Sequence, residues 1–115
     1  MRVLICGAGR VGQGIARRLS QEKHDVTIVD ADAERVDRVA TELDVRGVTG
    51  HAAHPSVLKS AGAVDCEMII AVTYYDEINM VICQIAHTLF SVPTKIARGR
   101  SQSYLDPAWK TLFSR

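Results

Sequence analysis

The chain begins with a short apolar run that ends directly in a glycine-rich turn. Residues 2–6 read Arg-Val-Leu-Ile-Cys, a pattern typical of a strand buried on both faces. Gly7-Ala8-Gly9-Arg10-Val11-Gly12 follows, and apolar residues then recur at helical spacing from Arg10 to Gln21. A GxGxxG motif between a strand and a helix predicts a βαβ unit, because its glycines allow a tight turn and close packing of the helix on the strand.

The rest of the chain repeats this alternation of strand and helix patterns. Further strands are predicted at residues 25–30, 45–49, 67–73 and 94–97, and further helices at 32–43, 54–62, 78–90 and about 106–114. No two-residue hairpin turn separates the strands, so right-handed crossovers are expected. The sequence therefore predicts an α/β fold, a Rossmann-like doubly wound parallel sheet of five strands in three layers. We expect the sixth strand of such a sheet to be missing by truncation.

Length and charge narrow the possibilities further. The 115 residues suit a single domain spanning 1–115, and 14 basic against 13 acidic residues give a net charge of +1. That charge is too small for sequence-independent binding of nucleic acid, so no nucleic-acid partner is expected. The apolar runs are too short for a membrane span, and no signal peptide is expected at Met1. Three scattered cysteines indicate reduced thiols in a cytosolic protein.

The glycine motif and a later aspartate predict a nucleotide site. The residues Gly7, Ala8, Gly9, Arg10, Val11 and Gly12 would hold phosphates at the N-terminus of the first helix. Asp30 ends the second predicted strand, 18 residues after Gly12, where a carboxylate can accept hydrogen bonds from both ribose hydroxyls and repels a 2′-phosphate. NAD(H) is therefore favoured, with ATP or ADP as alternatives, and NADP is disfavoured. The competing interpretations are a glycine turn without ligand and a turn or capping role for Asp30.

Two arginines are candidate phosphate ligands. Arg10 places a planar cation at the glycine loop, although it could also be a solvated residue of the first helical turn. Arg98 and Arg100 flank Gly99 at the carboxyl end of the fifth predicted strand, where ligands of open α/β sheets bind. We expect Arg98, which is nearer the strand, to meet a phosphate.

No residues with a catalytic or metal-binding pattern accompany this predicted site. The four histidines lack a carboxylate or cysteine at triad-like or metal-like local spacing, so no catalytic residue and no metal site are predicted. Two hypotheses remain. The first is a non-catalytic regulatory module that binds a nucleotide, and the second is the cofactor-binding half of a small NAD-dependent oxidoreductase.

Several segments resemble one protein family. They are GAGRVGQGIARRL from Gly7, HDVTIVDADAERV from His24, the stretch from Gly47 to Phe90 that contains AGAVDCEMIIAVTYYDEIN, and KIARGR from Lys95. From Arg2 to about Tyr104 the chain resembles the nucleotide-binding lobe (RCK, KTN or TrkA-N) of Trk-type bacterial potassium-uptake regulators.

The resemblance implies a role for each candidate residue. The Gly7–Gly12 loop and Arg98 would both contact the phosphates. Asp30 would bind the adenosine ribose. Thr73 and Tyr74 would line the middle of the nucleotide. Many relatives have an acidic residue that recognises adenine where this chain has His51, and we leave His51 outside the predicted site.

The resemblance also implies a place in the cell. It implies a regulatory subunit that is cytoplasmic and peripheral on the inner face of the membrane, without direct membrane insertion. Its partners would be a membrane potassium-translocating subunit and further copies of itself, as a dimer that builds a tetrameric or larger ring. Such proteins usually continue into a ligand-binding lobe. The edge strand 94–97, the helix 78–90 and the tail residues Trp109, Leu112 and Phe113 are the predicted self-association surface.

Overall fold

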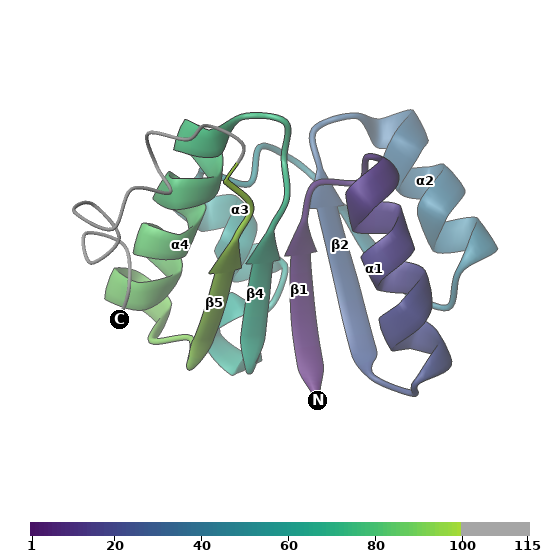
Figure 1. The fold of residues 1–115 in the computed structure, drawn as a ribbon, viewed down its shortest axis with the longest axis horizontal. Coiled ribbons are helices and arrows are strands. Elements are labelled where there is room, and N and C mark those ends of the chain that lie inside the picture. The colour runs from purple at the N-terminus through teal and green to yellow at the C-terminus, as the bar shows by residue number, and fades with distance from the viewer. Residues whose placement is uncertain (100–115) are drawn as a thin grey trace.

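The computed structural model describes residues 1–99, which form one parallel sheet with helices on both faces (Figure 1). The strands are β1 (Arg2–Cys6), β2 (Asp25–Asp30), β3 (Arg46–Thr49), β4 (Met68–Ala71) and β5 (Thr94–Ala97). The helices are α1 (Arg10–Gln21), α2 (Ala33–Glu42), α3 (Pro55–Ser60) and α4 (Asp76–Phe90), with a short 3₁₀ helix at Ala63–Asp65. The predicted C-terminal helix 106–114 lies outside the described residues.

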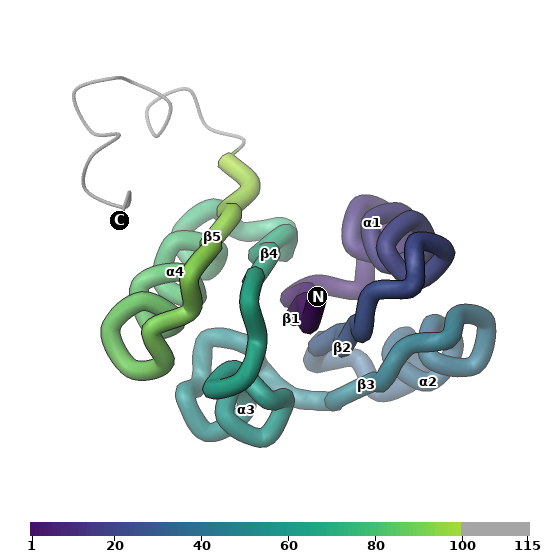
Figure 2. The backbone as a smooth tube through the Cα atoms, turned by 90° about the horizontal axis from the view of Figure 1, so that it is seen from below, coloured from purple at the N-terminus to yellow at the C-terminus, as the bar shows by residue number. Residues whose placement is uncertain are grey.

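The sheet has the strand order β3-β2-β1-β4-β5, and every neighbouring pair is parallel. The chain therefore winds outward from β1 to β3 and then returns to β4 on the other side of β1. Figure 2 shows α1 and α2 on one side of the sheet and α3 and α4 on the other. The doubly wound Rossmann-like fold predicted from the sequence is confirmed.

Alternating side chains of the central strand supply both cores. Val3 and Ile5 belong to the apolar cluster under α1 and α2, whereas Leu4 and Cys6 belong to the cluster under α3 and α4. All four are at most 2% exposed. Full burial of such a side chain contributes about 1.5–3 kcal/mol relative to exposure. This two-sided burial explains why the strand reads as a continuous apolar run.

The prediction for β4 was too long. The strand ends at Ala71 rather than Thr73, because the chain turns away from β1 after one last bond, from the Val72 N–H to the Cys6 carbonyl at 2.8 Å. The next N–H, that of Thr73, donates to the side chain of Asn79. Similarly, β3 begins at Arg46 rather than residue 45. The apolar pattern continues past the point where strand pairing stops.

Val11, an apolar residue in the first turn of α1, is not buried. The buried residues of that helix are Gly12 and Ala16, while Val11 is 39% exposed and faces the carboxyl edge of the sheet. Gly12 takes the buried position because α1 approaches the preceding loop too closely for any side chain.

Two glycines of the motif are required by this packing. Gly7 has a φ of +115°, and a Cβ there would lie 2.8 Å from the Val72 carbonyl oxygen. A Cβ on Gly12 would lie 1.8 Å from the Gly7 carbonyl oxygen. The first turn of α1 therefore rests directly on the backbone of the loop that precedes it.

Alanine substitutions at Gly12 and Gly14 test this contact within one helix. A methyl group at Gly12 would overlap the Gly7 carbonyl, so we expect Gly12→Ala to lower the free energy of unfolding by on the order of 2–4 kcal/mol. Gly14 has no heavy atom within 4 Å of its Cβ position. Gly14→Ala should therefore stabilise by about 0.5–1 kcal/mol. Urea unfolding measures both, and wild-type stability of Gly12→Ala would contradict the packing.

Candidate functional site

The carboxyl ends of the strands form one edge of the sheet, and backbone hydrogen bonds order the loops that leave it. Four N–H groups beyond the strand ends donate to carbonyls of the neighbouring strand at 2.8–2.9 Å, and they belong to Gly7, Gly50, Val72 and Arg98. From this edge α1 leaves toward one face and α4 toward the other, so a crevice opens between β1 and β4. Open α/β sheets bind ligands at such a point.

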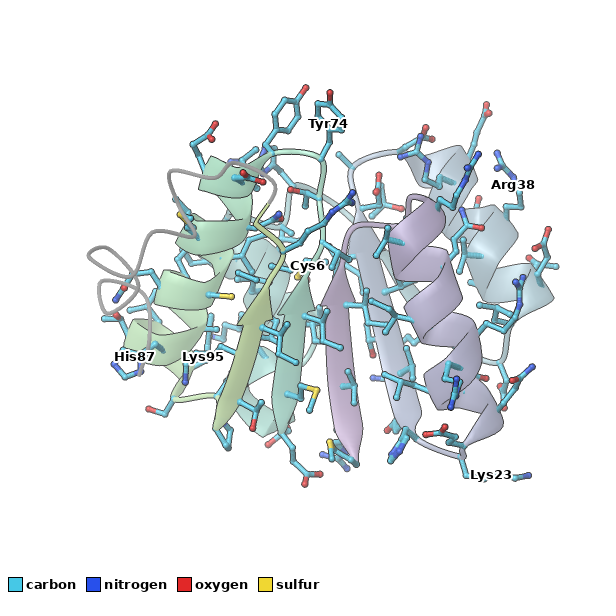
Figure 3. The ribbon with its side chains drawn as sticks, viewed as in Figure 1. Cys6, Lys23, Arg38, Tyr74, His87 and Lys95 are labelled. Carbon is cyan, nitrogen blue, oxygen red and sulfur yellow. The ribbon has the colours of Figure 1, made fainter. Side chains whose placement is uncertain are left out.

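A cleft of about 700 Å³ lies at this edge. Eight of the predicted site residues line it, and they are Gly7, Gly9, Arg10, Val11, Asp30, Thr73, Tyr74 and Arg98. The other two, Ala8 and Gly12, are buried and do not line it. Residues that were not predicted also line the cleft, among them Arg35, Gly50, His51, Ala52, Tyr75 and Ile78. Figure 3 shows Tyr74 above the sheet edge, at the opposite end of the molecule from Lys23.

The N-terminus of α1 is open toward this cleft. Gly9 is its N-cap, with no side chain to cap the helix and no acidic residue in the first turn. The first N–H groups of a helix lack intrahelical partners and carry partial positive charge. Within residues 1–99, apart from the adjoining backbone, no atom lies within 4 Å of the Cβ position of Gly9. The loop therefore leaves room for an anionic group such as a pyrophosphate to approach the backbone.

Asp30 holds the glycine loop against the end of β2. Its Oδ2 accepts the Ala8 N–H at 2.8 Å, and its Oδ1 accepts the Asp32 N–H at 2.9 Å. The Arg35 guanidinium lies 3.7 Å from Oδ2, and the Asp30 side chain is 15% exposed. Ala8 thus contributes an N–H to the protein's own carboxylate. Each carboxylate oxygen has a further lone pair, so Asp30 retains capacity to accept ribose hydroxyls.

Asp32, not Asp30, caps the helix that follows. Its side chain accepts the N–H groups of Glu34 at 3.1 Å and Arg35 at 3.2 Å, which is typical N-cap geometry. The alternative interpretation of Asp30 as a helix cap is therefore wrong, although Asp30 does accept a local turn bond. Because Asp32 caps α2, the Asp30 carboxylate remains at the cleft.

Positive charge reaches the cleft from three directions. Arg10 extends from the first turn of α1, Arg35 from α2 and Arg98 from the end of β5, and all three line the cleft. Arg35 is partly neutralised by Asp30. Arg100, the second arginine considered from the sequence, lies outside the described residues.

Asn79 ties together the two strand ends on the far side of the cleft. It is fully buried, and its Oδ1 accepts the Thr73 N–H at 2.8 Å and the Thr73 hydroxyl at 2.6 Å. Its Nδ2 donates to the carbonyls of Thr73 at 3.2 Å and Arg98 at 3.0 Å. The hydroxyl proton of Thr73 is therefore used within the protein. Sequence reasoning quoted Asn79 within a motif but assigned it no role, because its partners are set by the fold.

The three cysteines are buried thiols. Burial raises the pKa of the Cys66 and Cys83 thiols to about 11 and raises that of Cys6 above its ordinary range, so all three stay protonated at neutral pH. Among residues 1–99, no three His, Cys, Asp or Glu side chains come together in a way that could hold a metal ion. In the same residues, every helix is too short or too polar to cross a bilayer.

Comparison with known sequences gives a family and named relatives. The TrkA-N domain family matches residues 3–112. The chain is 56% identical over 115 residues to the Trk system potassium uptake protein TrkA of Azorhizobium caulinodans, covering 100% of this chain and 25% of that protein. It is 51% identical over 105 residues to the protein of the same name from Halomonas elongata, covering 91% and 23%. The chain thus spans about a quarter of these relatives.

Comparison with solved structures gives the same fold. The Kef CTD of Shewanella denitrificans in its AMP-bound form is 26% identical with a TM-score of 0.78, covering 95% of this chain and 68% of that chain. The TrkA-N domain of the inner membrane protein ybaL from Escherichia coli is 22% identical with a TM-score of 0.87, covering 98% and 82%. The GsuK channel bound to NAD is 17% identical with a TM-score of 0.76, covering 98% and 20%.

Removing the amide of Asn79 should destabilise the loops after β4 and β5, which form one wall of the cleft. Asn79→Leu leaves the Thr73 N–H and two carbonyls without their buried partner, so we expect a loss on the order of 2–4 kcal/mol in the free energy of unfolding. Gln84→Ala is the control on the same helix, since Gln84 is exposed and donates to the Thr88 hydroxyl at 2.8 Å. It should stay within about 0.5 kcal/mol. Urea unfolding at equal midpoints for the two variants would contradict the assignment.

Proposed function

The chain belongs to the TrkA-N domain family, and from this and its cleft we propose that it is the nucleotide-binding lobe of a regulatory protein of potassium uptake. The names of its relatives support the potassium-uptake system. Gly9 supports the nucleotide, because among residues 1–99 no packing contact requires glycine there, unlike at Gly7 and Gly12. In this role the lobe binds a ligand and performs no chemistry on it.

The proposed ligand follows the order of the groups along the sheet edge. Its pyrophosphate would lie on the Gly7–Val11 backbone at the N-terminus of α1, and its adenosine ribose hydroxyls would donate hydrogen bonds to the Asp30 carboxylate. Arg10 and Arg98 would approach the phosphates from the two walls. Thr73 and Tyr74 would lie beside the middle of the ligand. Ala8 and Gly12 would hold the loop in shape beneath it.

We propose NAD(H) as the preferred ligand, with ATP or ADP as alternatives and NADP disfavoured. The Kef CTD structure contains AMP and the GsuK structure contains NAD, and these ligands share an adenosine 5′-phosphate. The glycine loop and Asp30 suit this adenosine 5′-phosphate portion. The Asp30 carboxylate would repel a 2′-phosphate, and Arg35 only partly offsets its charge.

The regulator is preferred over the alternative, the cofactor-binding half of an NAD-dependent oxidoreductase. A glycine loop with an acidic residue is common to both classes, so it does not separate them. The relatives at 56% and 51% identity carry transport names.

Regulation would require the ligand to favour one arrangement of the lobe over another. We propose that the lobe acts peripherally at the inner face of the membrane, on a potassium-translocating subunit, within a ring built from dimers. Val81 and Leu89 on α4 and Ile96 on the edge strand β5 are 46%, 59% and 47% exposed, and they are the proposed self-association surface in the described chain.

Calorimetric titration tests the ligand assignment. NADH, NAD, ATP and ADP should bind, and NADPH should bind about tenfold more weakly because its 2′-phosphate meets the Asp30 carboxylate. Binding of NADPH alone, or of none of these nucleotides, would rule out the proposed function.

Gly9→Ala separates ligand binding from folding. The added methyl would project into open space, so the free energy of unfolding should fall by no more than about 1 kcal/mol, the usual preference for glycine over alanine at an N-cap. It would also occupy the path of the phosphates, so affinity for NADH should fall by about tenfold or more. Gly14→Ala is the matched control, since it adds a methyl to open space outside the cleft. Unchanged NADH affinity of Gly9→Ala would remove the glycine loop from the site.

The same substitution, carried in the complete protein, connects binding to transport. Rubidium uptake by cells with Gly9→Ala should differ from uptake by cells with Gly14→Ala at equal protein levels. Identical uptake, together with lost NADH binding, would show that nucleotide binding does not control the transporter.

A further inference from the structure

A second cavity lies at the amino ends of the strands, the edge of the sheet opposite the nucleotide cleft (Figure 1). Its volume is about 180 Å³, and it shares no lining residue with the cleft. The cavity opens between the beginnings of β1, β2 and β3 and residues 61–66, which follow α3. Its size suits a ligand much smaller than a dinucleotide.

Thr27 of β2 carries a polar group into this cavity. The residue is 6% exposed and lines the cavity. Its hydroxyl has no hydrogen-bond partner among residues 1–99, and in the same residues no fully buried side-chain nitrogen or oxygen lacks one. The hydroxyl therefore reaches solvent, and it does so through the cavity. A valine would fill the same space without a polar group, so packing gives no reason for the hydroxyl.

The strand register places a cation beside this hydroxyl. Arg46 of β3 is the parallel partner of Thr27, so the two side chains leave the same face of the sheet from strands about 5 Å apart. Leu4, the partner of Thr27 on β1, belongs to the apolar cluster under α3 and α4, which identifies that face. A guanidinium and a hydroxyl side by side can donate together to one carboxylate.

The charged residues around the cavity include one of each sign without an ion pair. Arg2 and Asp25 lie 3.8 Å apart at the rim and offset each other. Arg46 and Asp65 also line the cavity, and neither forms an ion pair within residues 1–99. An inorganic anion would satisfy Arg46 but would be repelled by the Asp65 carboxylate. A small ligand with one negative and one positive group would satisfy both.

We propose that this cavity binds a small amino acid as its zwitterion. The carboxylate of the ligand accepts hydrogen bonds from the Arg46 guanidinium and the Thr27 hydroxyl. The ammonium group of the ligand donates to the Asp65 carboxylate. The lobe then has two ligand sites, at opposite edges of one sheet, and the second does not depend on the proposed function.

Three related molecules test the need for both charges. L-Alanine carries both groups, propionate lacks the ammonium, and ethylamine lacks the carboxylate. In an NMR titration, L-alanine at millimolar concentration should shift the amide signals of Thr27, Arg46 and Asp65 but not that of Gly9 in the cleft. Propionate and ethylamine should each bind at least about tenfold more weakly. The proposal is overturned if glycine, L-alanine and L-serine all fail to bind, or if propionate binds as tightly as L-alanine.

Two substitutions test the residues of the cavity. Thr27→Val removes the hydroxyl and keeps the shape, whereas Asp65→Asn removes the negative charge of an exposed residue. Each should weaken L-alanine binding by about tenfold and leave NADH affinity at the wild-type level. Asp44→Asn is the control, since Asp44 is exposed near the start of β3 and does not line the cavity. Wild-type affinity of either folded variant for L-alanine would overturn the site.

Discussion

The close contact between Gly12 and the Gly7 carbonyl governs the geometry of the whole carboxyl edge. A Cβ at Gly12 would lie 1.8 Å from that oxygen, so α1 can begin where it does only with glycine at this position. The contact places the first turn of α1 directly above the end of β1. It also brings the Ala8 N–H within 2.8 Å of Asp30. The phosphate loop and the carboxylate therefore form one unit, and a change in either moves both.

A second polar anchor stabilises the opposite wall. Asn79 joins Thr73 after β4 to Arg98 after β5, as Asp30 joins β2 to the glycine loop. The two anchors lie on opposite sides of the point where the helices change face. A ligand in the proposed position would contact both walls. Such a ligand could favour one relative placement of the walls, which is the property that a regulatory lobe needs.

Local pattern predicted most of the fold because burial in this protein follows the period of each element. The bounds of β1, α1, β2 and β5 agree with the predictions, since continuous apolar runs and helical stripes there end at glycine, aspartate or a turn. β4 was predicted too long because Val72 and Thr73 suit a strand, although the Thr73 N–H donates to the Asn79 side chain and not to a strand. Of the proposed site, spacing alone indicated the loop and Asp30. The role of Asn79 depends on its contact with Arg98, which the fold brings from a distant segment and which no local pattern contains.

The three glycines of the motif carry different information. Position 7 requires glycine because φ is positive there and the Val72 carbonyl lies too close for a Cβ. Position 12 requires glycine because the first turn of α1 packs directly on the Gly7 carbonyl. The packing requires both glycines even without a ligand, so they are evidence for the fold and not for a ligand site. Gly9 has an extended backbone that any residue can adopt, and its missing Cβ faces empty space. The protein's own packing gives no reason for glycine there. Closeness of a ligand to the backbone does give one, and for this reason the middle glycine is the strongest single argument for a bound phosphate.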